Sequence, residues 1–225
     1  MTVDSLDESS YEQLTRSHYR DPAVARRYAH RQSLVRSPAE WLVGRLERWH
    51  VRRALRRLRL PAGPQILDSP AGSGKLQPLL IGMSAFYCAA DVSPAMLSFG
   101  RPSATVVADA AQLPFRSGAF DATVCLRLLH RVPRTVLDAM LSEATRVSTQ
   151  GVVFSYTGRA RSGGLHRLIQ RVTGRSGQRL LQLSPGEIEE LTGTRGERML
   201  RDRSISFGLT AERVAVVACA TGDHA

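Results

Sequence analysis

Residues 65–76 constrain the fold of this chain more than any other stretch. An apolar pair is followed by Asp68, and a turn of small residues that includes Gly72 and Gly74 leads into a helix-compatible segment. Glycine lets the backbone come close to a ligand where a Cβ would clash, and the first turn of a helix offers unpaired N–H groups. The pattern is typical of a parallel strand that passes into a helix at the edge of a nucleotide-type site.

After this turn, short apolar runs alternate with helical stretches, which predicts a parallel sheet with crossover helices. The expected strands cover residues 65–68, 86–90, 104–108, 121–126 and 151–156. The expected helices cover residues 75–82, 94–99, 134–147 and 185–191. Two final strands, near 203–209 and 213–220, are close enough in sequence to form an antiparallel pair. The chain is therefore predicted to have an α/β fold.

Two helix starts precede the sheet region. Asp21-Pro22 places proline at the first helical position, and Ser37-Pro38-Ala39-Glu40 adds a capping box to the same signal. We expect the second helix to run to about Leu60, where a segment rich in proline and glycine follows. The predicted domains are an N-terminal helical cap over residues 1–61, flexible over 1–15, and a core over 62–225 with a basic insert at 157–182.

Arginine dominates the charge of the chain. The net charge is +11, which favours an anionic partner such as nucleic acid, phospholipid headgroups or a phosphorylated substrate. A coding preference for arginine would explain the choice of arginine among the basic residues without any function, whereas the excess of positive charge still favours such a partner. The helix that begins after Ser37 carries many of these arginines beside an apolar stripe. Either it packs on the core with a solvated basic face, or that face contacts a membrane or nucleic acid.

The cysteines and apolar runs bear on the compartment. Cys88, Cys125 and Cys219 lie in apolar runs without metal-ligand spacing, so we expect free thiols and no metal site. Charged residues interrupt every apolar run well before the roughly 20 residues that a spanning helix needs. The acidic N-terminal segment is unlike a secretory signal. We expect a cytoplasmic protein, with peripheral contact to the inner membrane surface left open.

Each predicted strand of the middle region ends beside a residue with binding chemistry. Asp91 follows the second strand, 23 residues after Asp68, where an acid can bind a ribose diol. Asp109 follows the third strand, and Arg127 and His130 follow the fourth. Ligands of open α/β sheets bind outside the carboxyl ends of the strands, so these groups should converge. The alternatives are a helix-cap role for Asp91 and a turn role for Asp109.

Four motifs in this region resemble those of class I S-adenosylmethionine-dependent methyltransferases, with a type 11-like pattern. They are Ile66-Leu67-Asp68-x-x-x-Gly72-x-Gly74, Ala90-Asp91-Val92-Ser93-Pro94-x-Met96-Leu97, Ala108-Asp109-Ala110-x-x-Leu113-Pro114-Phe115 and Phe120-Asp121-x-x-Val124. The resemblance covers residues 62–157, and Pro70 departs from the commonest pattern, which has glycine there. It implies a Rossmann-like, mostly parallel seven-stranded sheet with a reversed terminal hairpin, and S-adenosylmethionine as cofactor.

The resemblance also implies a role for each motif residue. Gly72 and Gly74 would meet the amino-acid end of the cofactor, and Asp68 would hold its ammonium group. Asp91 would accept hydrogen bonds from the ribose hydroxyls. The other implied contacts are Val92, Met96 on the adenine, Asp109 and Ala110 at the adenine amino group, and Leu126 and Arg127 along the methionine part.

Two other nucleotide-binding hypotheses fit less well. A phosphate loop would need glycine at position 69 and Ser or Thr at position 76, where this chain has Ser69 and Leu76. The three-glycine fingerprint of dinucleotide oxidoreductases is also incomplete. The spacing to Asp91 and Asp109 therefore favours S-adenosylmethionine.

The acceptor is less constrained than the cofactor. Methyl transfer is an in-line displacement, so the protein chiefly aligns the nucleophile. His130 is the first candidate base, although a histidine without a chemical role is equally compatible, and Tyr28 or Tyr156 could border the methyl group. The Asn-Pro-Pro-Tyr and Asp-Pro-Pro-Tyr motifs of base-amine methylation are missing after the fourth strand. We therefore expect O- or N-methylation of a small-molecule or lipid-type, anionic acceptor; RNA methylation and a non-catalytic subunit that binds a partner protein are the alternatives.

Overall fold

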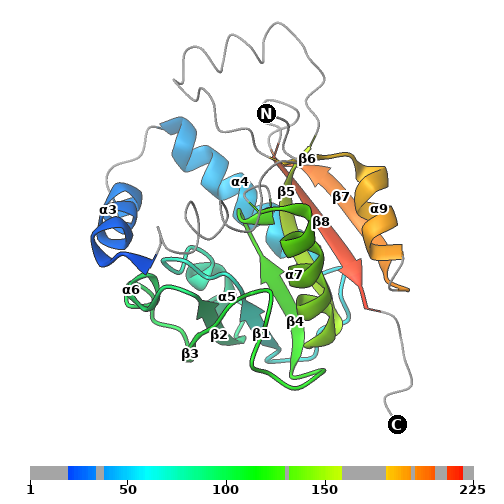
Figure 1. Ribbon diagram of the computed structural model, residues 1–225, viewed down its shortest axis with the longest axis horizontal. Coiled ribbons are helices and arrows are strands. Elements are labelled where there is room, and N and C mark those ends of the chain that lie inside the picture. The colour runs from blue at the N-terminus through cyan, green and yellow to red at the C-terminus, as the bar shows by residue number, and fades with distance from the viewer. Residues whose placement is uncertain are drawn as a thin grey trace, which may run out of the picture.

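The structure is a computed structural model and describes residues 20–33, 38–129, 132–158, 181–193, 196–205 and 212–219. One sheet lies at its centre, with helices on both faces (Figure 1). The strands are β1 (Gln65–Asp68), β2 (Phe86–Asp91), β3 (Ala104–Val107), β4 (Phe120–Cys125), β5 (Ser148–Gly158), β6 (Gln182–Leu183), β7 (Arg198–Ser204) and β8 (Glu212–Ala218). The helices are α3 (Pro22–Ser33), α4 (Pro38–Leu55), α5 (Gln77–Ile81), α6 (Pro94–Leu97), α7 (Arg134–Arg146) and α9 (Pro185–Gly193).

The strand order is β3-β2-β1-β4-β5-β8-β7, and β6 pairs with β5 off this path. Neighbours from β3 to β5 run parallel, whereas β8 runs antiparallel to both β5 and β7. The predicted Rossmann-like, mostly parallel sheet with a reversed terminal hairpin is confirmed. The sheet has eight strands instead of seven because the two-residue β6 adds a short parallel pairing beside β5.

The terminal hairpin begins earlier than the sequence predicted. β7 starts at Arg198, whereas the prediction placed it near 203–209, and residues 206–211 lie outside the described part. β7 is an edge strand, where charged side chains are tolerated and protect against unwanted pairing. Its arginine-rich sequence hides the apolar alternation on which the prediction depended.

Helix α4 ends at Leu55, earlier than the predicted Leu60. The N–H groups of Arg57 and Leu58 donate to carbonyls only three residues back, so the chain tightens into a turn there. Leu58 is buried by this turn and joins the core on one face of the sheet. Packing of Leu58 therefore favours the tighter turn over further α-helix.

Separate apolar cores lie on the two faces of the sheet. On one face, α4 and α5 supply buried side chains such as Val51, Leu55 and Leu80. On the other face, α7 and α9 supply residues such as Leu137 and Ile188. Burial from both sides explains why the central strands read as continuous apolar runs.

The two N-terminal helices pack on the sheet region instead of standing apart from it. α3 packs against α6, and α4 packs against β8 and β5. The division into a cap over 1–61 and a core over 62–225 stays a prediction, and residues 1–15 and most of the basic insert lie outside the described part. None of the described helices is long and apolar enough to cross a membrane. Cys88, Cys125 and Cys219 are free thiols.

Candidate cofactor site at the carboxyl ends of β1, β2 and β4

In the turn after β1, part of the backbone faces open space. Gly72 and Gly74 have φ values of 53° and 75°, in the left-handed region that glycine adopts without a Cβ penalty. A Cβ at Gly74 would lie 3.2 Å from Cα of Gly100, so glycine is also required there by close packing. A Cβ at Gly72 would meet no heavy atom of the described residues within 4 Å. Gly72 therefore presents backbone to a space that a ligand could use.

Asp91 joins the ends of β1 and β2. Its side chain is buried, and its carboxylate oxygens accept hydrogen bonds from the N–H groups of Gly72 (2.8 Å) and Ser93 (2.9 Å). Burial raises the pKa of Asp91, and the two backbone donors oppose that rise. Ser93 itself caps α6 by accepting from the N–H of Met96. Asp91 is thus not the cap residue of α6, and it fixes the glycine turn instead.

Asp68 lies fully within the protein at the end of β1. Burial raises its pKa to about 8, and the negative charge of Asp91 acts in the same direction. The Tyr87 hydroxyl donates to Asp68 over 3.2 Å and lowers the pKa in part. Sequence reasoning missed Tyr87, although alternation along parallel β1 and β2 puts it on the same sheet face as Asp68.

Ser69 adds an unsatisfied polar group to the same turn. Its side chain is buried, and its hydroxyl has no hydrogen-bond partner among the described residues. Buried polar groups in folded proteins are nearly always paired, so such an atom indicates a bound group or water. Sequence reasoning used Ser69 only to exclude a phosphate loop.

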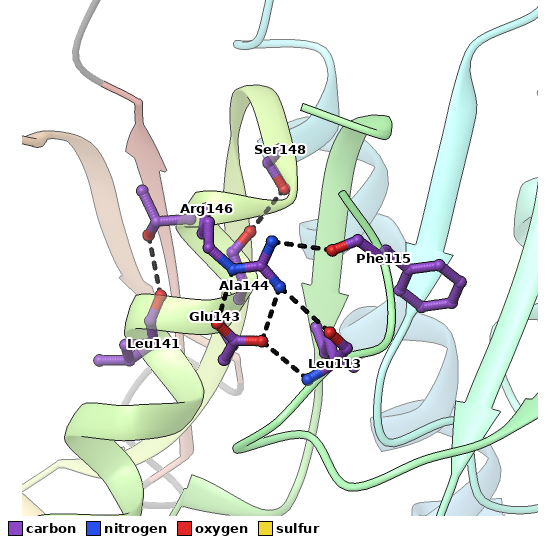
Figure 2. A network of polar contacts seen from close by, with 8 residues as sticks. Leu113, Phe115, Leu141, Glu143, Ala144, Arg146 and Ser148 are labelled. Carbon is purple, nitrogen blue, oxygen red and sulfur yellow. Dashed lines mark hydrogen bonds and ion pairs between the residues drawn. The ribbon is translucent and has the colours of Figure 1, made fainter. Parts of the chain in front are cut away.

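The loop after β3 is held by a clamp from α7, drawn in Figure 2. Glu143 accepts from the N–H of Leu113 (2.7 Å), and Arg146 pairs with Glu143 through two hydrogen bonds of 2.7 and 2.8 Å. The same guanidinium donates to the carbonyls of Phe115 (2.8 Å) and Leu113 (3.1 Å). The clamp fixes the Leu113–Phe115 segment a few residues beyond Asp109.

Asp109 and the residues around it form a compact turn. One Asp109 oxygen accepts from the N–H of Ala111 (3.0 Å), and Asp109 pairs with Gln112 in an isolated bridge. Ala110 is buried between them. In the segment that follows Asp91, Met96 is buried in α6 and Val92 is half-buried. The turn role for Asp109 is therefore present.

Arg127 ties the end of β4 to the N-terminal helices. Its φ of 61° is uncommon for a residue with a side chain, and its N–H donates to the Ser155 hydroxyl over 2.8 Å. Its guanidinium forms a two-point ion pair with the buried Glu47 of α4, with Nε to Oε1 at 2.7 Å. Arg127 and the half-buried Leu126 thus border the same strand ends, but the arginine charge is already matched. Glu47 and Arg127 are 80 residues apart in the sequence, so no local pattern predicted this pair.

The structure describes the catalytic candidates only in part. His130 lies outside the described residues, and Tyr28 lies in α3 without a described side chain. Tyr156 is buried in β5, where its hydroxyl donates to Asp202 (2.8 Å) and accepts from Arg213 (3.1 Å). Tyr156 therefore has a structural role.

Comparison with known proteins places this geometry in a family. The methyltransferase-domain family matches residues 66–151, the segment from β1 into β5 that holds the turn, Asp91 and Asp109. Residues 66–151 therefore form a methyltransferase domain. No curated protein matches the sequence significantly.

Solved structures share the fold of this methyltransferase domain at low identity. Magnesium protoporphyrin IX methyltransferase (ChlM) from Synechocystis PCC 6803 with bound SAH is 17% identical with a TM-score of 0.71, covering 93% of this chain and 100% of that chain. The [4+2]-cyclase SpnF is 14% identical with a TM-score of 0.60, covering 78% of this chain and 81% of that chain. A methyltransferase in complex with the Haloferax volcanii Trm112 methyltransferase activator is 17% identical with a TM-score of 0.59, covering 83% of this chain and 97% of that chain. These likenesses establish the fold.

Proposed function

We propose that this methyltransferase domain binds S-adenosylmethionine at the carboxyl ends of β1, β2 and β4 and transfers its methyl group to a small-molecule or lipid-type, anionic acceptor. The observation that carries the proposal is the meeting of Asp91 and Gly72 beside the open face of the glycine turn. Similar structures with bound SAM or SAH support the choice of cofactor.

The residues at this site fit the polar parts of the cofactor. A carboxylate has about four acceptor positions, and Asp91 uses two of them for backbone N–H groups, which leaves acceptors for a ribose diol. The Ser69 hydroxyl, which has no partner in the described part of the chain, and the buried Asp68 lie on the turn that would meet the amino-acid end. An ammonium group there would favour the charged form of Asp68.

The remaining contacts follow the predicted assignments. Met96 and Val92 would border the adenine, and Asp109 and Ala110 would meet its amino group from the clamped loop. Leu126 and Arg127 would lie along the methionine part; the Arg127 guanidinium is engaged by Glu47, so its aliphatic stem would make this contact.

S-adenosylmethionine supplies an electrophilic methyl group on a sulfonium. The chain's own residues then have to orient the acceptor in line with that methyl group and exclude water. Asp91 and the clamp on Leu113–Phe115 would fix the two ends of the nucleoside part. His130, as a base, and Tyr28, beside the methyl group, stay predictions.

Charge supports an anionic acceptor. The chain carries a net charge of +11, and the segment after β4 lacks the motif of base-amine methylation. The charge favours an anionic acceptor, nucleic acid included, and the missing motif is what favours an acidic small molecule or lipid over a nucleic-acid base.

A transfer assay with labelled S-adenosylmethionine tests this proposal. Cell extract is divided into small-molecule, lipid, protein and RNA fractions, and label incorporated by wild type is compared with that by Asp91→Asn. Asp121→Asn is the matched control, because Asp121 binds the N–H of Gln65 at the opposite end of β1.

Label in the small-molecule or lipid fraction, lost in Asp91→Asn and kept in Asp121→Asn, is the expected result. Ribonuclease-sensitive label would establish the RNA alternative instead. Cofactor binding without label in any fraction would favour a non-catalytic subunit, for which the Trm112 complex suggests a protein partner.

A further inference from the structure

The outer face of α4 exposes large apolar side chains in one place. Trp41 is 54% exposed, Leu42 51% and Trp49 51%. They are three of the seven large hydrophobic residues exposed in the described part of the chain, and they lie on a single helix. Exposed apolar side chains that cluster in this way mark interaction surfaces, whereas isolated ones do not.

Arginines are interleaved with these apolar side chains. The Arg45 guanidinium lies 4.8 Å from the Trp41 ring centre, and the Arg53 guanidinium lies 5.4 Å from that of Trp49. At 100° per residue, the stripe from Trp41 through Arg45 and Trp49 to Arg53 spans about 120° of the helix surface. Arg52 and Leu42 fall within the same arc. We call these six residues the Trp–Arg stripe.

The opposite face of α4 is fixed to the protein. His50, Val51 and Ala54 are buried, and Glu47 is paired with Arg127 at the end of β4. Glu47 is the acidic residue among the described side chains of α4, and it lies away from the stripe. The outward face therefore presents indole rings, a leucine and guanidinium groups without a described carboxylate among them.

We propose that the Trp–Arg stripe docks α4 flat on a bilayer surface that carries anionic lipid headgroups. Indole rings favour the boundary between headgroups and hydrocarbon, and arginines beside them attract anionic lipids. A helix surface is convex and suits a plane, whereas single-stranded nucleic acid is usually held in a basic groove. This inference does not depend on the proposed reaction.

Docking would also orient the candidate site. Glu47 and Arg127 join α4 to the end of β4, and Figure 1 shows α4 alongside the upper part of the central strands. A membrane held by the outer face of α4 would lie near the rim of the candidate cofactor site. The stripe would then bring this rim close to an acceptor that is itself in the membrane.

Tryptophan fluorescence provides a direct test, because Trp41 and Trp49 are the two tryptophans of the whole chain. The full-length protein is titrated with phosphatidylcholine vesicles with and without phosphatidylglycerol, and brominated lipids are used to quench emission. We expect a blue shift and quenching only with the anionic vesicles, weakened by added salt.

Two charge-reversal variants separate the stripe from the overall charge. Arg45→Glu/Arg53→Glu should weaken vesicle binding roughly tenfold or more, since each arginine near an anionic surface contributes substantially. Arg101→Glu/Arg116→Glu changes the net charge equally at exposed positions off α4 and should bind almost like wild type. Unchanged emission with anionic vesicles, equal losses in the two variants, or an emission change caused by RNA but not by vesicles would overturn the proposal.

Discussion

Asp68 shows how burial couples the candidate site to pH. Its pKa rises from an ordinary 3.8 to about 8, so the folded protein keeps a proton that the unfolded chain has released. Its contribution to stability is therefore complete below pH 4 and is lost as pH rises towards about 8. The same carboxyl would lose its proton when a cofactor ammonium binds beside it.

The first prediction concerns this pH dependence. Between pH 5 and 8 (about three pH units), the free energy of unfolding of wild type should fall relative to that of Asp68→Asn, by at most about 1.4 kcal/mol per pH unit. Asparagine retains an acceptor for Tyr87 but does not titrate. Urea unfolding at several pH values measures the difference, and parallel curves for the two proteins would contradict it.

Gly151 is a second residue on which stability depends, because the fold leaves no room for a Cβ at this position. A Cβ there would lie 2.2 Å from the Val217 carbonyl oxygen and 2.7 Å from Cδ2 of Leu58. Gly151→Ala should lower the free energy of unfolding by about 3 kcal/mol, because a backbone carbonyl cannot move aside easily. Gly186→Ala is the control: it lies in α9 without a described heavy atom within 4 Å and should be neutral or slightly stabilising. Chemical denaturation compares the two, and similar effects would refute the steric argument.

At the scale of elements, α7 holds the Leu113–Phe115 segment in place, although this segment lies well before α7 in the sequence. Arg146→Ala should lower the free energy of unfolding by about 1–3 kcal/mol, because it removes the hydrogen bonds of the guanidinium to Glu143 and to two carbonyls. Amide hydrogen exchange should also speed up around Leu113–Phe115. Arg134→Ala, at the exposed start of the same helix, should do neither. Protection of the loop that is unchanged in Arg146→Ala would show that the clamp is not what holds it.

The Glu47–Arg127 pair is the corresponding link between α4 and the sheet. A double-mutant cycle with Glu47→Gln and Arg127→Met should give a coupling free energy of about 1–3 kcal/mol, because the pair is two-point and Glu47 is buried. Thermal and urea unfolding of the four proteins measure this coupling. A coupling near zero would mean that α4 is held by its apolar face alone.

The elements that sequence predicted well are those with a strong local pattern. β1 was predicted with its observed bounds, and β2, β3, β4 and α7 to within a residue at each end. Burial on both faces gives β1, β2 and β4 a continuous apolar run, the edge strand β3 is rich in β-branched residues, and α7 has a clear helical period. β7 was misplaced because its edge position removes the apolar signal, and α4 was predicted too long because tertiary burial of Leu58 ends it.

The candidate site also contains residues that the sequence predicted and residues that it did not. Strand ends and glycine spacing predicted that Asp68, Asp91 and the Gly72 turn lie at one edge of the sheet, since parallel strands bring their carboxyl ends together, and Gly72 does donate to Asp91. Their contacts with a cofactor stay predictions. Tyr87, Ser69 and Glu47 were missed because their roles depend on contacts across strands or on burial. No short-range sequence pattern records such contacts.

At the scale of the whole molecule, the fold constrains the identity of the cofactor more than the identity of the acceptor. The [4+2]-cyclase SpnF and a porphyrin methyltransferase share this architecture with the chain, so architecture alone does not select a reaction. The features of this chain from which we infer an anionic partner are its net charge of +11 and the Trp–Arg stripe on α4.

The most direct test of the account is isothermal titration with S-adenosylmethionine of wild type, Asp91→Asn and Asp121→Asn. We predict one site per chain in wild type and Asp121→Asn, and affinity weaker by roughly tenfold or more in Asp91→Asn, which loses its charge-assisted hydrogen bonds. Circular dichroism and thermal unfolding would show that the three proteins fold alike. No binding to wild type, or equal affinity in all three proteins, would contradict the assignment of the site.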